Sequence, residues 1–239
     1  MFKISVCMAT FNGEKYIKEQ LDSILIQLNS TDEIIISDDS SSDNTIQIIE
    51  SINDSRIKLF KNQVFKNPIF NFENALNNAT GDYIFLSDQD DIWLPNKVKS
   101  MITKLTKYDL VVSDCLIGDS KLNIIHQSHF IWRNSKTGLL KNLYKNSYLG
   151  CCMAFRKEIL KKVLPFPKNI PMFDMWIGLI SEIYFKPYFL NDKLFIYRRH
   201  DNNVTLLTSD FKSKFSLLHK IKIRLNLLIA LSFRFFINR

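Results

Sequence analysis

Short apolar runs alternate with segments of helical periodicity along the first half of the chain. The apolar runs are five to eight residues long and rich in Ile and Val, which is typical of buried strands. Strands that alternate with helices through short loops predict a parallel sheet built from right-handed βαβ units. The expected strands are 3–10, 33–37, 56–60, 82–88 and 108–115, and the expected helices are 17–28, 44–52, 70–80 and 95–105.

Polar clusters directly follow three of the expected strands. Residues 10–12 follow the first, Asp38 and Asp39 follow the second, and residues 88–91 follow the fourth. The carboxyl ends of the strands form the ligand crevice of an open parallel sheet. We therefore expect the three clusters to meet in space, although they lie far apart in the sequence.

The periodic pattern becomes looser after about Leu116. Segment 147–164 reads as a strand and a helix, 172–185 as a helix, and 186–205 as one or two strands. We expect one α/β domain over 1–208, with a mostly parallel central sheet. Its nucleotide-fold half is 1–115, its half at 116–208 forms the other wall of the cleft, and 209–239 is a tail.

The formal net charge of +8 is concentrated in this tail. Residues 211–239 hold seven of the 32 Lys and Arg residues and no Asp or Glu, so 25 basic and 24 acidic residues remain for the rest of the chain. A nucleic-acid-binding protein would spread its positive charge over one face of the globule. The distribution therefore argues against a nucleic-acid partner.

The tail has the pattern of a basic amphipathic helix. Its most apolar part, 225–237, is too short to cross a bilayer and is interrupted by Arg234. Such a helix can lie on the anionic inner leaflet of a membrane, or it can pack on the body or on a second subunit. One side of the helix carries Leu217, Leu218, Ile221, Leu225, Leu228 and Ile229, and the other carries mainly His219, Lys220 and Arg224.

The four cysteines are interpreted as buried thiols in a reducing cytoplasm. They form no CxxC pair, have no His at a zinc-ligand spacing and follow no secretory signal. The run "GCCMAF" is apolar and lacks a neighbouring base, which argues against a thiol nucleophile.

The stretch "LSDQDDIWL" (86–94) crowds three carboxylates between apolar neighbours. Like charges and apolar walls both raise the cost of ionisation, so a positive charge is expected there. Asp88 and Asp90 form an Asp-x-Asp pair that can hold a divalent cation, with substrate phosphates and water completing its coordination. Asp90 is the expected metal ligand, whereas capping of the following helix can explain Asp91.

Missing phosphate-loop motifs, the pair Asp38 and Asp39, and Trp93 also bear on the kind of ligand that the chain binds. The chain has no GxGxxG and no Walker sequence, which disfavours dehydrogenases and P-loop NTPases and leaves phosphates to a metal ion. Asp38 and Asp39 suit hydrogen bonds to a base and to ribose hydroxyls, but they could also form a turn. Trp93 is either a wall of a sugar pocket or a core residue.

Four segments together resemble the family 2 glycosyltransferases, and specifically the rhamnosyltransferase-like branch of bacterial surface polysaccharide synthesis. They are "SVCMATFNGEKYIKEQLDSI", "IIISDDSSSDNT", "ATGDYIFLSDQDDIWLPNKV" and "YLGCCMAFRKEIL". The resemblance implies a GT-A fold, a nucleotide-diphosphate sugar donor, Mg²⁺ or Mn²⁺, and inversion at the anomeric carbon by direct displacement. dTDP-rhamnose is the first expected donor, and a UDP-hexose is the second.

The resemblance also implies roles for individual residues on the nucleotide side. Thr10, Phe11 and Asn12 would line the base and ribose, Asp38 would contact the base, and Asp39 would belong to the same nucleotide site. Asp88 would approach the ribose or the sugar, and Asp90 would bind the metal.

The second half would supply the base that deprotonates the acceptor hydroxyl. "MFDMWIG" makes Asp174 the candidate, although relatives often have His where this chain has Phe173. Apolar neighbours would raise the pKa of Asp174 and so suit it to this work. "YRRHDNNVT" resembles the family's Tyr-Arg-x-His-x-x-Asn stretch, which makes His200 a metal-side candidate and Arg198 and Arg199 candidates for the phosphate or sugar.

The expected activity is transfer of one sugar to a hydroxyl of a lipid-linked or surface glycan. The enzyme would be peripheral on the cytoplasmic face of the inner membrane and would contact it through the tail. Two alternatives remain: a sugar-phosphate nucleotidyltransferase, for which "TFNGEKY" is a poor phosphate loop, and a non-catalytic membrane or nucleic-acid binding module.

Overall fold

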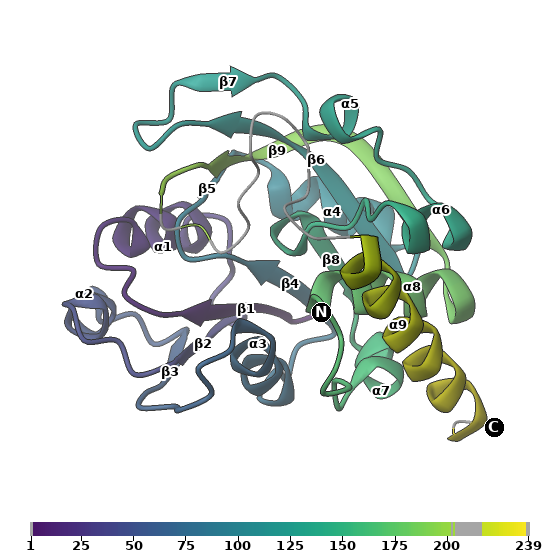
Figure 1. Cartoon of the computed structure of the whole chain (residues 1–239). Helices are drawn as coiled ribbons and strands as arrows, with labels where there is room; N and C mark the ends of the chain where they lie inside the picture. Colours follow the sequence, from purple (N-terminus) through teal and green to yellow (C-terminus); the bar gives the residue numbers. More distant parts are fainter. Residues whose placement is uncertain (1, 202, 204–216, 238–239) are drawn as a thin grey trace.

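The computed structural model describes residues 2–201, Asn203 and 217–237 (Figure 1). Its strands are β1 (Ile4–Thr10), β2 (Glu33–Asp38), β3 (Ile57–Phe60), β4 (Tyr83–Ser87), β5 (Ile92–Trp93), β6 (Leu110–Gly118), β7 (Ile124–His126), β8 (Met153–Arg156) and β9 (Pro187–Arg198). Its helices are α1 (Ile17–Leu25), α2 (Thr45–Ile52), α3 (Pro68–Asn77), α4 (Lys97–Leu105), α5 (His129–Arg133), α6 (Leu139–Tyr144), α7 (Leu160–Val163), α8 (Phe173–Tyr184) and α9 (Leu217–Ile237), with 3₁₀ turns η1 (Gly150–Cys152) and η2 (Lys157–Ile159).

The strands form one mixed sheet in the order β3-β2-β1-β4-β8-β6-β9-β5, with β7 paired to β6. The first four strands are parallel, as the sequence predicts, and β8 runs antiparallel to β4 and β6 on either side of it. The predicted boundary after Cys115 falls inside β6, so both halves of the chain contribute to the same sheet. The boundary at 208 lies outside the described residues.

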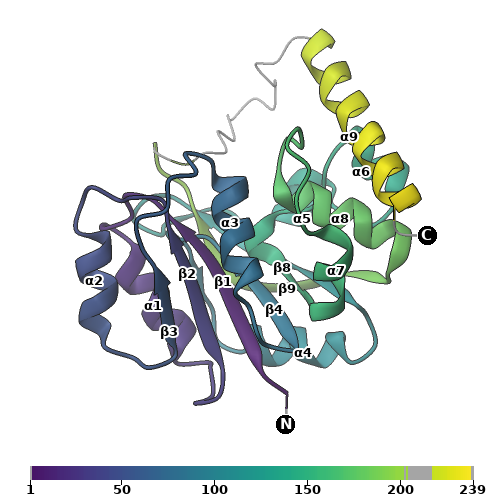
Figure 2. The same ribbon diagram turned by 90° about the horizontal axis from the view of Figure 1, so that it is seen from below.

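Helices cover both faces of the parallel part of the sheet (Figure 2). α1 and α4 are neighbours on one face, where the Val98 backbone N–H donates to Gln27 Oε1 at 3.3 Å. α3 and α8 are neighbours on the other face, where the rings of Phe72 and Phe173 stack at 4.2 Å. β1 and β2 are buried almost throughout, which explains their continuous apolar runs.

The structure corrects the expected start of the helix after the acidic cluster. We predicted that it begins at Pro95, but it begins at Lys97, because Asn96 has a left-handed φ of 69° that turns the chain first. The short strand β5 precedes this turn and pairs with β9, a partner more than 100 residues away. Periodicity within a short window carries no signal for such a pairing.

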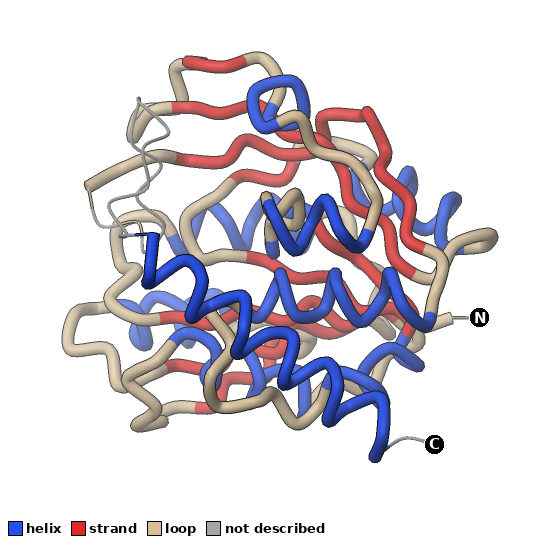
Figure 3. Tube along the Cα trace, turned by 45° about the vertical axis from the view of Figure 1, so that its right-hand side comes forward, coloured by secondary structure: helices blue, strands red, loops and turns tan. Residues whose placement is uncertain are grey.

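α9 lies across the outside of the helices that cover one face of the sheet (Figure 3). It packs through Leu227 and Leu231, which are buried, and through Arg234, which donates to the carbonyl oxygen of Leu164 at 2.7 Å. Packing on the body, one of the alternatives that the sequence left open, is therefore what the structure shows for this helix. No helix within the described part of the chain combines the length and apolar character that a membrane span requires.

Candidate active site

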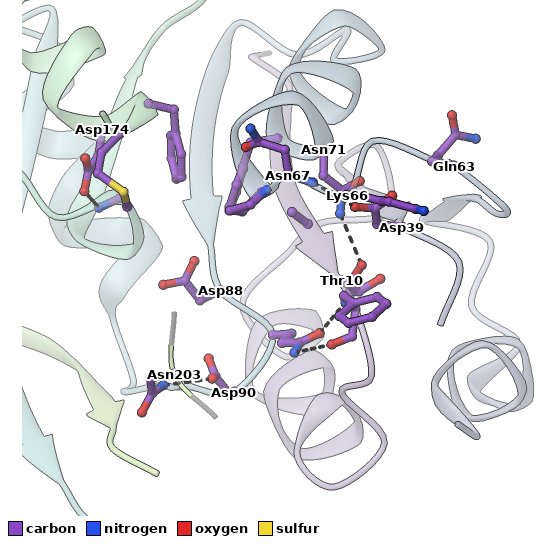
Figure 4. Close-up of a pocket in the computed structure, with 18 of the residues that line it drawn as sticks. Thr10, Asp39, Gln63, Lys66, Asn67, Asn71, Asp88, Asp90, Asp174 and Asn203 are labelled. Atoms are coloured by element: carbon purple, nitrogen blue, oxygen red, sulfur yellow. Dashed lines mark hydrogen bonds between the residues drawn. The ribbon is translucent and has the colours of Figure 1, made fainter. Parts of the chain in front are cut away.

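A cavity of about 600 Å³ opens at the carboxyl ends of β1, β2 and β4 (Figure 4). It is lined by residues at or directly after the ends of these strands, among them Thr10, Asp39 and Asp88, and by Asp174 from the second half of the chain. The register explains the convergence, because Thr10 lies opposite Asp38, and Met8 lies opposite Ser87. The predicted meeting of the three polar clusters is thus confirmed.

The loop after β1 contributes a polar and an aromatic wall. Thr10 and the exposed ring of Phe11 line the cavity, and the Phe11 backbone is clamped by Gln89, whose side chain both donates to and accepts from it. Asn12 does not line the cavity. It has a left-handed φ of 49°, and its Oδ1 accepts a 2.8 Å hydrogen bond from the Ser42 N–H, so it braces two loops.

The structure corrects the roles expected for the two acids after β2. Asp38 is completely buried, and its carboxylate accepts from Thr10 Oγ1 at 2.9 Å and from both the N–H and the hydroxyl of Ser41. Asp38 therefore forms a turn, which is the alternative role that the sequence left open for it. Asp39 lines the cavity instead, while accepting from the Phe65 N–H at 2.7 Å.

Asp90 lies at the junction between residues 88–91, called the acidic turn below, and the loop after β9. Its Oδ2 is 2.7 Å from His200 Nε2 and 3.2 Å from Asn203 Nδ2. Asp90 and Asn203 line the cavity, and His200 lies directly behind them. Residues more than 100 positions apart therefore meet at the predicted metal position.

Ionisation of Asp88 and of Asp91 in the acidic turn is disfavoured. Burial, and next the charge of Asp90, raise the pKa of Asp88 to about 7, and the same causes hold the pKa of Asp91 well above its usual range. Ligand atoms of Asp88, Asp91 and Cys151 lie within 4.8 Å of one another. A buried group of this kind gains stability from a cation nearby.

The potential metal ligands of this site fit a hard divalent cation. Asp90 and Asp88 offer carboxylate oxygens at the cavity wall, and such oxygens together with phosphate and water suit Mg²⁺ or Mn²⁺. His200 reaches the same place through its contact with Asp90. The chemistry of these residues is therefore compatible with the expected metal.

Arg198 is a positioning residue rather than a cavity residue. Its guanidinium donates to the carbonyl oxygens of Asp90 and Ser120 and to the Glu19 carboxylate, and its backbone N–H donates to Asp91. It therefore holds the acidic turn from behind, which corrects its expected phosphate role. Arg199 also does not line the cavity, and its backbone N–H donates to the carbonyl oxygen of Gly118.

Trp93 is a core residue, which settles the alternative that the sequence left open. It is 3% exposed, packs against Phe85 and lies away from the main cavity. Its ring contacts the buried amine of Lys97, which also lies 4.0 Å from the ring centre of Phe195. Lys97 Nζ donates to the carbonyl oxygen of Cys151 at 2.7 Å, and so ties α4 to the η1 turn.

Asp174 lies in the first turn of α8, at the opposite end of the cavity from Asp39 (Figure 4). Its Oδ2 accepts from the Gly150 N–H at 3.2 Å. Burial raises the pKa of Asp174 to about 7, and the backbone hydrogen bonds oppose this rise only in part. Gly150 leaves room for Phe173 at this point, because a Cβ atom would stand 2.9 Å from the Phe173 ring and displace it.

Several cavity residues escaped the sequence analysis. Lys66, Asn67 and Asn71 come from a loop and a helix start without a recognised motif. Others lie inside stretches that the sequence analysis quotes without assigning them to the site: Gln89 in "LSDQDDIWL", Phe173 in "MFDMWIG", and Tyr197 and Asn203 in "YRRHDNNVT". The residues concerned are Gln63, Val64, Lys66, Asn67, Pro68, Asn71, Phe72, Gln89, Leu149, Gly150, Met172, Phe173, Tyr197 and Asn203.

The four cysteines are free and buried, as predicted. Cys115, His129 and Cys152 bring potential ligand atoms within 4.8 Å of one another, a grouping that the sequence spacing did not reveal. Burial raises the pKa of both thiols and lowers that of His129 to about 4, so all three groups are held in their neutral forms.

Comparison with known proteins agrees with this architecture. Residues 5–164 match the model of Glycosyl transferase family 2. The chain belongs to this family. It is 28% identical over 239 residues to the dTDP-rhamnosyl transferase RfbG of Shigella flexneri, covering 90% of this chain and 79% of that protein.

Another relative is the UDP-Glc:alpha-D-GlcNAc-diphosphoundecaprenol beta-1,3-glucosyltransferase WfgD of Escherichia coli. It is 27% identical over 76% of this family 2 chain and 71% of its own length. Among solved structures, S. aureus TarS 1–349 in complex with UDP-GlcNAc superposes with a TM-score of 0.70 at 21% identity, covering 95% of this chain and 71% of TarS. These likenesses confirm the GT-A fold.

The glucosyl-3-phosphoglycerate synthase of Mycobacterium tuberculosis shares the fold as well. Its structure, solved with Mn²⁺ and UDP, has a TM-score of 0.58 at 19% identity, and the match covers 98% of this chain and 80% of that one. A solved relative of this fold therefore binds a divalent cation together with a nucleotide. The chain itself is a nucleotide-sugar glycosyltransferase of family 2.

Proposed function

We propose that the protein is an inverting, metal-dependent transferase that moves one sugar from a nucleotide-diphosphate donor to a hydroxyl of a lipid-linked glycan. The observation that carries this proposal is the position of Asp174. It faces Asp88 and Asp90 across one cavity, with its pKa raised to about 7. A base at one end and a diphosphate anchor at the other suit direct displacement.

Asp174 would take the proton from the acceptor hydroxyl as the oxygen attacks the anomeric carbon. The bond from that carbon to the donor phosphate breaks on the opposite face, and the nucleoside diphosphate leaves with the electron pair. A carboxylate with a pKa near the working pH is an efficient general base. A divalent cation held by Asp90, with Asp88 and His200, would neutralise the leaving diphosphate.

The nucleoside would occupy the end of the cavity at Phe11 and Asp39. Phe11 offers an exposed aromatic face for stacking, and Asp39 offers a carboxylate at the cavity wall. The donor is dTDP-rhamnose or a UDP-hexose, since relatives of this chain are named for a dTDP-rhamnosyl and a UDP-Glc transfer.

The acceptor would be a glycan on a lipid diphosphate, as the name of WfgD implies for that relative. Work on such an acceptor places the enzyme at the cytoplasmic face of the inner membrane. The basic tail, with its seven Lys and Arg residues and no acid from 211 onward, would contact that surface.

A thermal-shift screen tests the donor part of the proposal. UDP, dTDP, GDP and CDP, and the sugar nucleotides of the first two, would be added with and without Mn²⁺. Binding to the folded state raises the unfolding temperature by mass action. We expect the largest rise for dTDP or UDP ligands with Mn²⁺, and no rise with any of them would contradict the proposal.

The products decide between the transferase and its nearest rival. A glycosyltransferase releases a nucleoside diphosphate from a sugar nucleotide, whereas a sugar-phosphate nucleotidyltransferase releases pyrophosphate from a nucleoside triphosphate. Incubation with dTDP-rhamnose or UDP-glucose and a lipid-diphosphate glycan should yield the nucleoside diphosphate. Release of pyrophosphate from dTTP or UTP with a sugar phosphate would establish the rival instead.

A further inference from the structure

α9 is apolar around much of its circumference, and the body covers only one side of it. The covered side carries Leu227 and Leu231, which are at most 8% exposed. The other side carries Ile221, Leu225, Leu228 and Ile229, which are between 45% and 54% exposed. A helix that is apolar around most of its circumference is normally buried on all sides.

The exposed side is the apolar face that the sequence predicts for the tail. Those four residues are the part of the predicted face whose side chains the structure describes, while the side chains of Leu217 and Leu218 lie outside the description. The packing on the body therefore uses a different side of the helix. Packing on the body and contact with a further surface are compatible.

The exposed side continues onto α6. Arg224 joins the two helices, because its guanidinium donates to the Tyr144 carbonyl oxygen at 2.6 Å and lies over the Tyr144 ring. On α6, Leu140 and Tyr144 lie one turn apart and are 81% and 78% exposed. Large apolar side chains from two adjacent helices thus remain uncovered on one part of the surface.

Positive charge accompanies this apolar surface. Lys222 is exposed on α9, and Lys145 is exposed directly after α6. The amine of Lys141 on α6 is buried beneath this surface, and its pKa is lowered to about 8, first by burial and then by the charges of Lys145, Lys136 and Arg133. The cations therefore lie close enough to repel one another, and an anionic surface would relieve that repulsion.

We propose that the exposed side of α9, together with Leu140 and Tyr144 of α6, is a docking surface for an anionic lipid bilayer. It is called the α6–α9 face below. The inference rests on the proposed function and adds a structured element of the catalytic domain to the predicted tail. Apolar side chains would enter the interface while Lys145 and Lys222 meet lipid phosphates.

The charge favours a bilayer over a second copy of the chain. Two α6–α9 faces brought together in a symmetric dimer would oppose cation to cation, since residues 211–239 contain no acid to pair with them. An anionic bilayer supplies both the apolar layer and the counter-charges. No described helix, α9 included, is apolar enough over the length that a membrane span requires.

Vesicle co-sedimentation of the full chain tests the proposal. The vesicles would be phosphatidylcholine with and without phosphatidylglycerol. The variants would be Leu228→Asn/Ile229→Asn and Lys145→Gln/Lys222→Gln. Ile26→Asn is the matched control, because Ile26 is a single apolar residue that is 85% exposed at the end of α1. Circular dichroism would verify that each variant is folded.

We expect the parent chain and Ile26→Asn to bind anionic vesicles at least about tenfold more tightly than neutral ones. Both double variants should weaken binding to the anionic vesicles about tenfold or more. Release of nucleoside diphosphate from the donor should be unchanged in all of them, which separates this proposal from the proposed function. Equal binding of the parent and both double variants would overturn it, as would a dimer that Leu228→Asn/Ile229→Asn dissociates without any effect on vesicle binding.

Discussion

The two walls of the cavity are built by different means. On the donor wall, where the sugar donor would bind, Thr10 ends a parallel strand and Asp39 and Asp88 each directly follow one, so the ladder of β2, β1 and β4 fixes their spacing. On the acceptor wall, Asp174 comes from the first turn of a helix and Asn203 from a loop. Side-chain contacts such as Gly150 N–H to Asp174 and His200 to Asp90 hold these residues in place.

Because of this difference, the place of a residue near the crevice is easier to predict than the role of its side chain. Strand ends predict which residues reach the crevice, but they do not predict which of two adjacent side chains enters it. Asp38 and Asp39 are an example. The carboxylate of Asp38 accepts hydrogen bonds from Thr10 and Ser41, whereas Asp39 reaches the cavity. On the acceptor wall even the position depends on contacts between distant segments.

The largest expected effect is that of Asp90→Ala, which removes the residue where the two walls meet. We expect transfer to fall about 1,000-fold or more, because a cation on the leaving diphosphate contributes several kcal/mol to the transition state. The rise in unfolding temperature that Mn²⁺ adds to nucleotide binding should also disappear. Full transfer activity, measured as release of nucleoside diphosphate, would refute the metal site at Asp90.

Asp174→Asn tests the acceptor wall alone. Transfer should fall about 100-fold or more, since general bases contribute factors of this size, while donor binding should be retained. In the parent enzyme, activity should fall as the pH drops below about 7, because protonated Asp174 cannot accept a proton. A parent pH profile without this limb, or a variant with full activity, would contradict the assignment.

The same substitution should stabilise the protein at high pH. The folded pKa of Asp174, about 7, lies above the ordinary value of 3.8, so the folded state retains a proton that the unfolded state has released. This raised pKa lowers the free energy of unfolding. The loss is absent below pH 3.8, grows between pH 3.8 and pH 7, and is complete above pH 7. Asp174→Asn should therefore be roughly 1 to 3 kcal/mol more stable than the parent at pH 8, and about equal to it at pH 4, in urea unfolding.

The sequence predicts the donor wall far better than the acceptor wall, for a physical reason. Strand alternation and the crevice rule locate Thr10, Asp39, Asp88 and Asp90 from patterns within a few residues. Asp174 was found only through resemblance to the family, as was His200. The buried state of Trp93 and Arg198 depends on β5 and β9 pairing across more than 100 residues, which leaves no local pattern.

Lys97→Met tests whether the two walls are coupled through the core. Lys97 is buried beneath the acidic turn and bonds the Cys151 carbonyl, and the Cys151 side chain lies beside Asp88 and Asp91. Met should fill the space between the rings of Trp93 and Phe195, so the fold should persist. We expect Mn²⁺ affinity to fall about tenfold, as for other residues that support metal ligands, with a higher KM for the donor.

The matched control for this variant is Lys99→Met, two positions along the same helix and exposed. It should change neither Mn²⁺ affinity nor KM. If Lys97→Met lowers only the unfolding temperature and leaves Mn²⁺ binding as in the parent, Lys97 serves the fold and does not position the acidic turn.

The smallest expected effects come from Asp39→Asn and Asp38→Asn, which compare the two adjacent acids on the donor wall. Asp39→Asn should weaken nucleotide binding about tenfold, since a hydrogen bond to a carboxylate contributes about 1.5 kcal/mol or more. Asp38→Asn should instead lower the free energy of unfolding by about 1 to 2 kcal/mol, because its amide would replace an acceptor shared by Thr10 and Ser41. Titration calorimetry with dTDP or UDP and urea unfolding separate the two, and a tenfold loss of affinity in Asp38→Asn alone would return the base contact to Asp38.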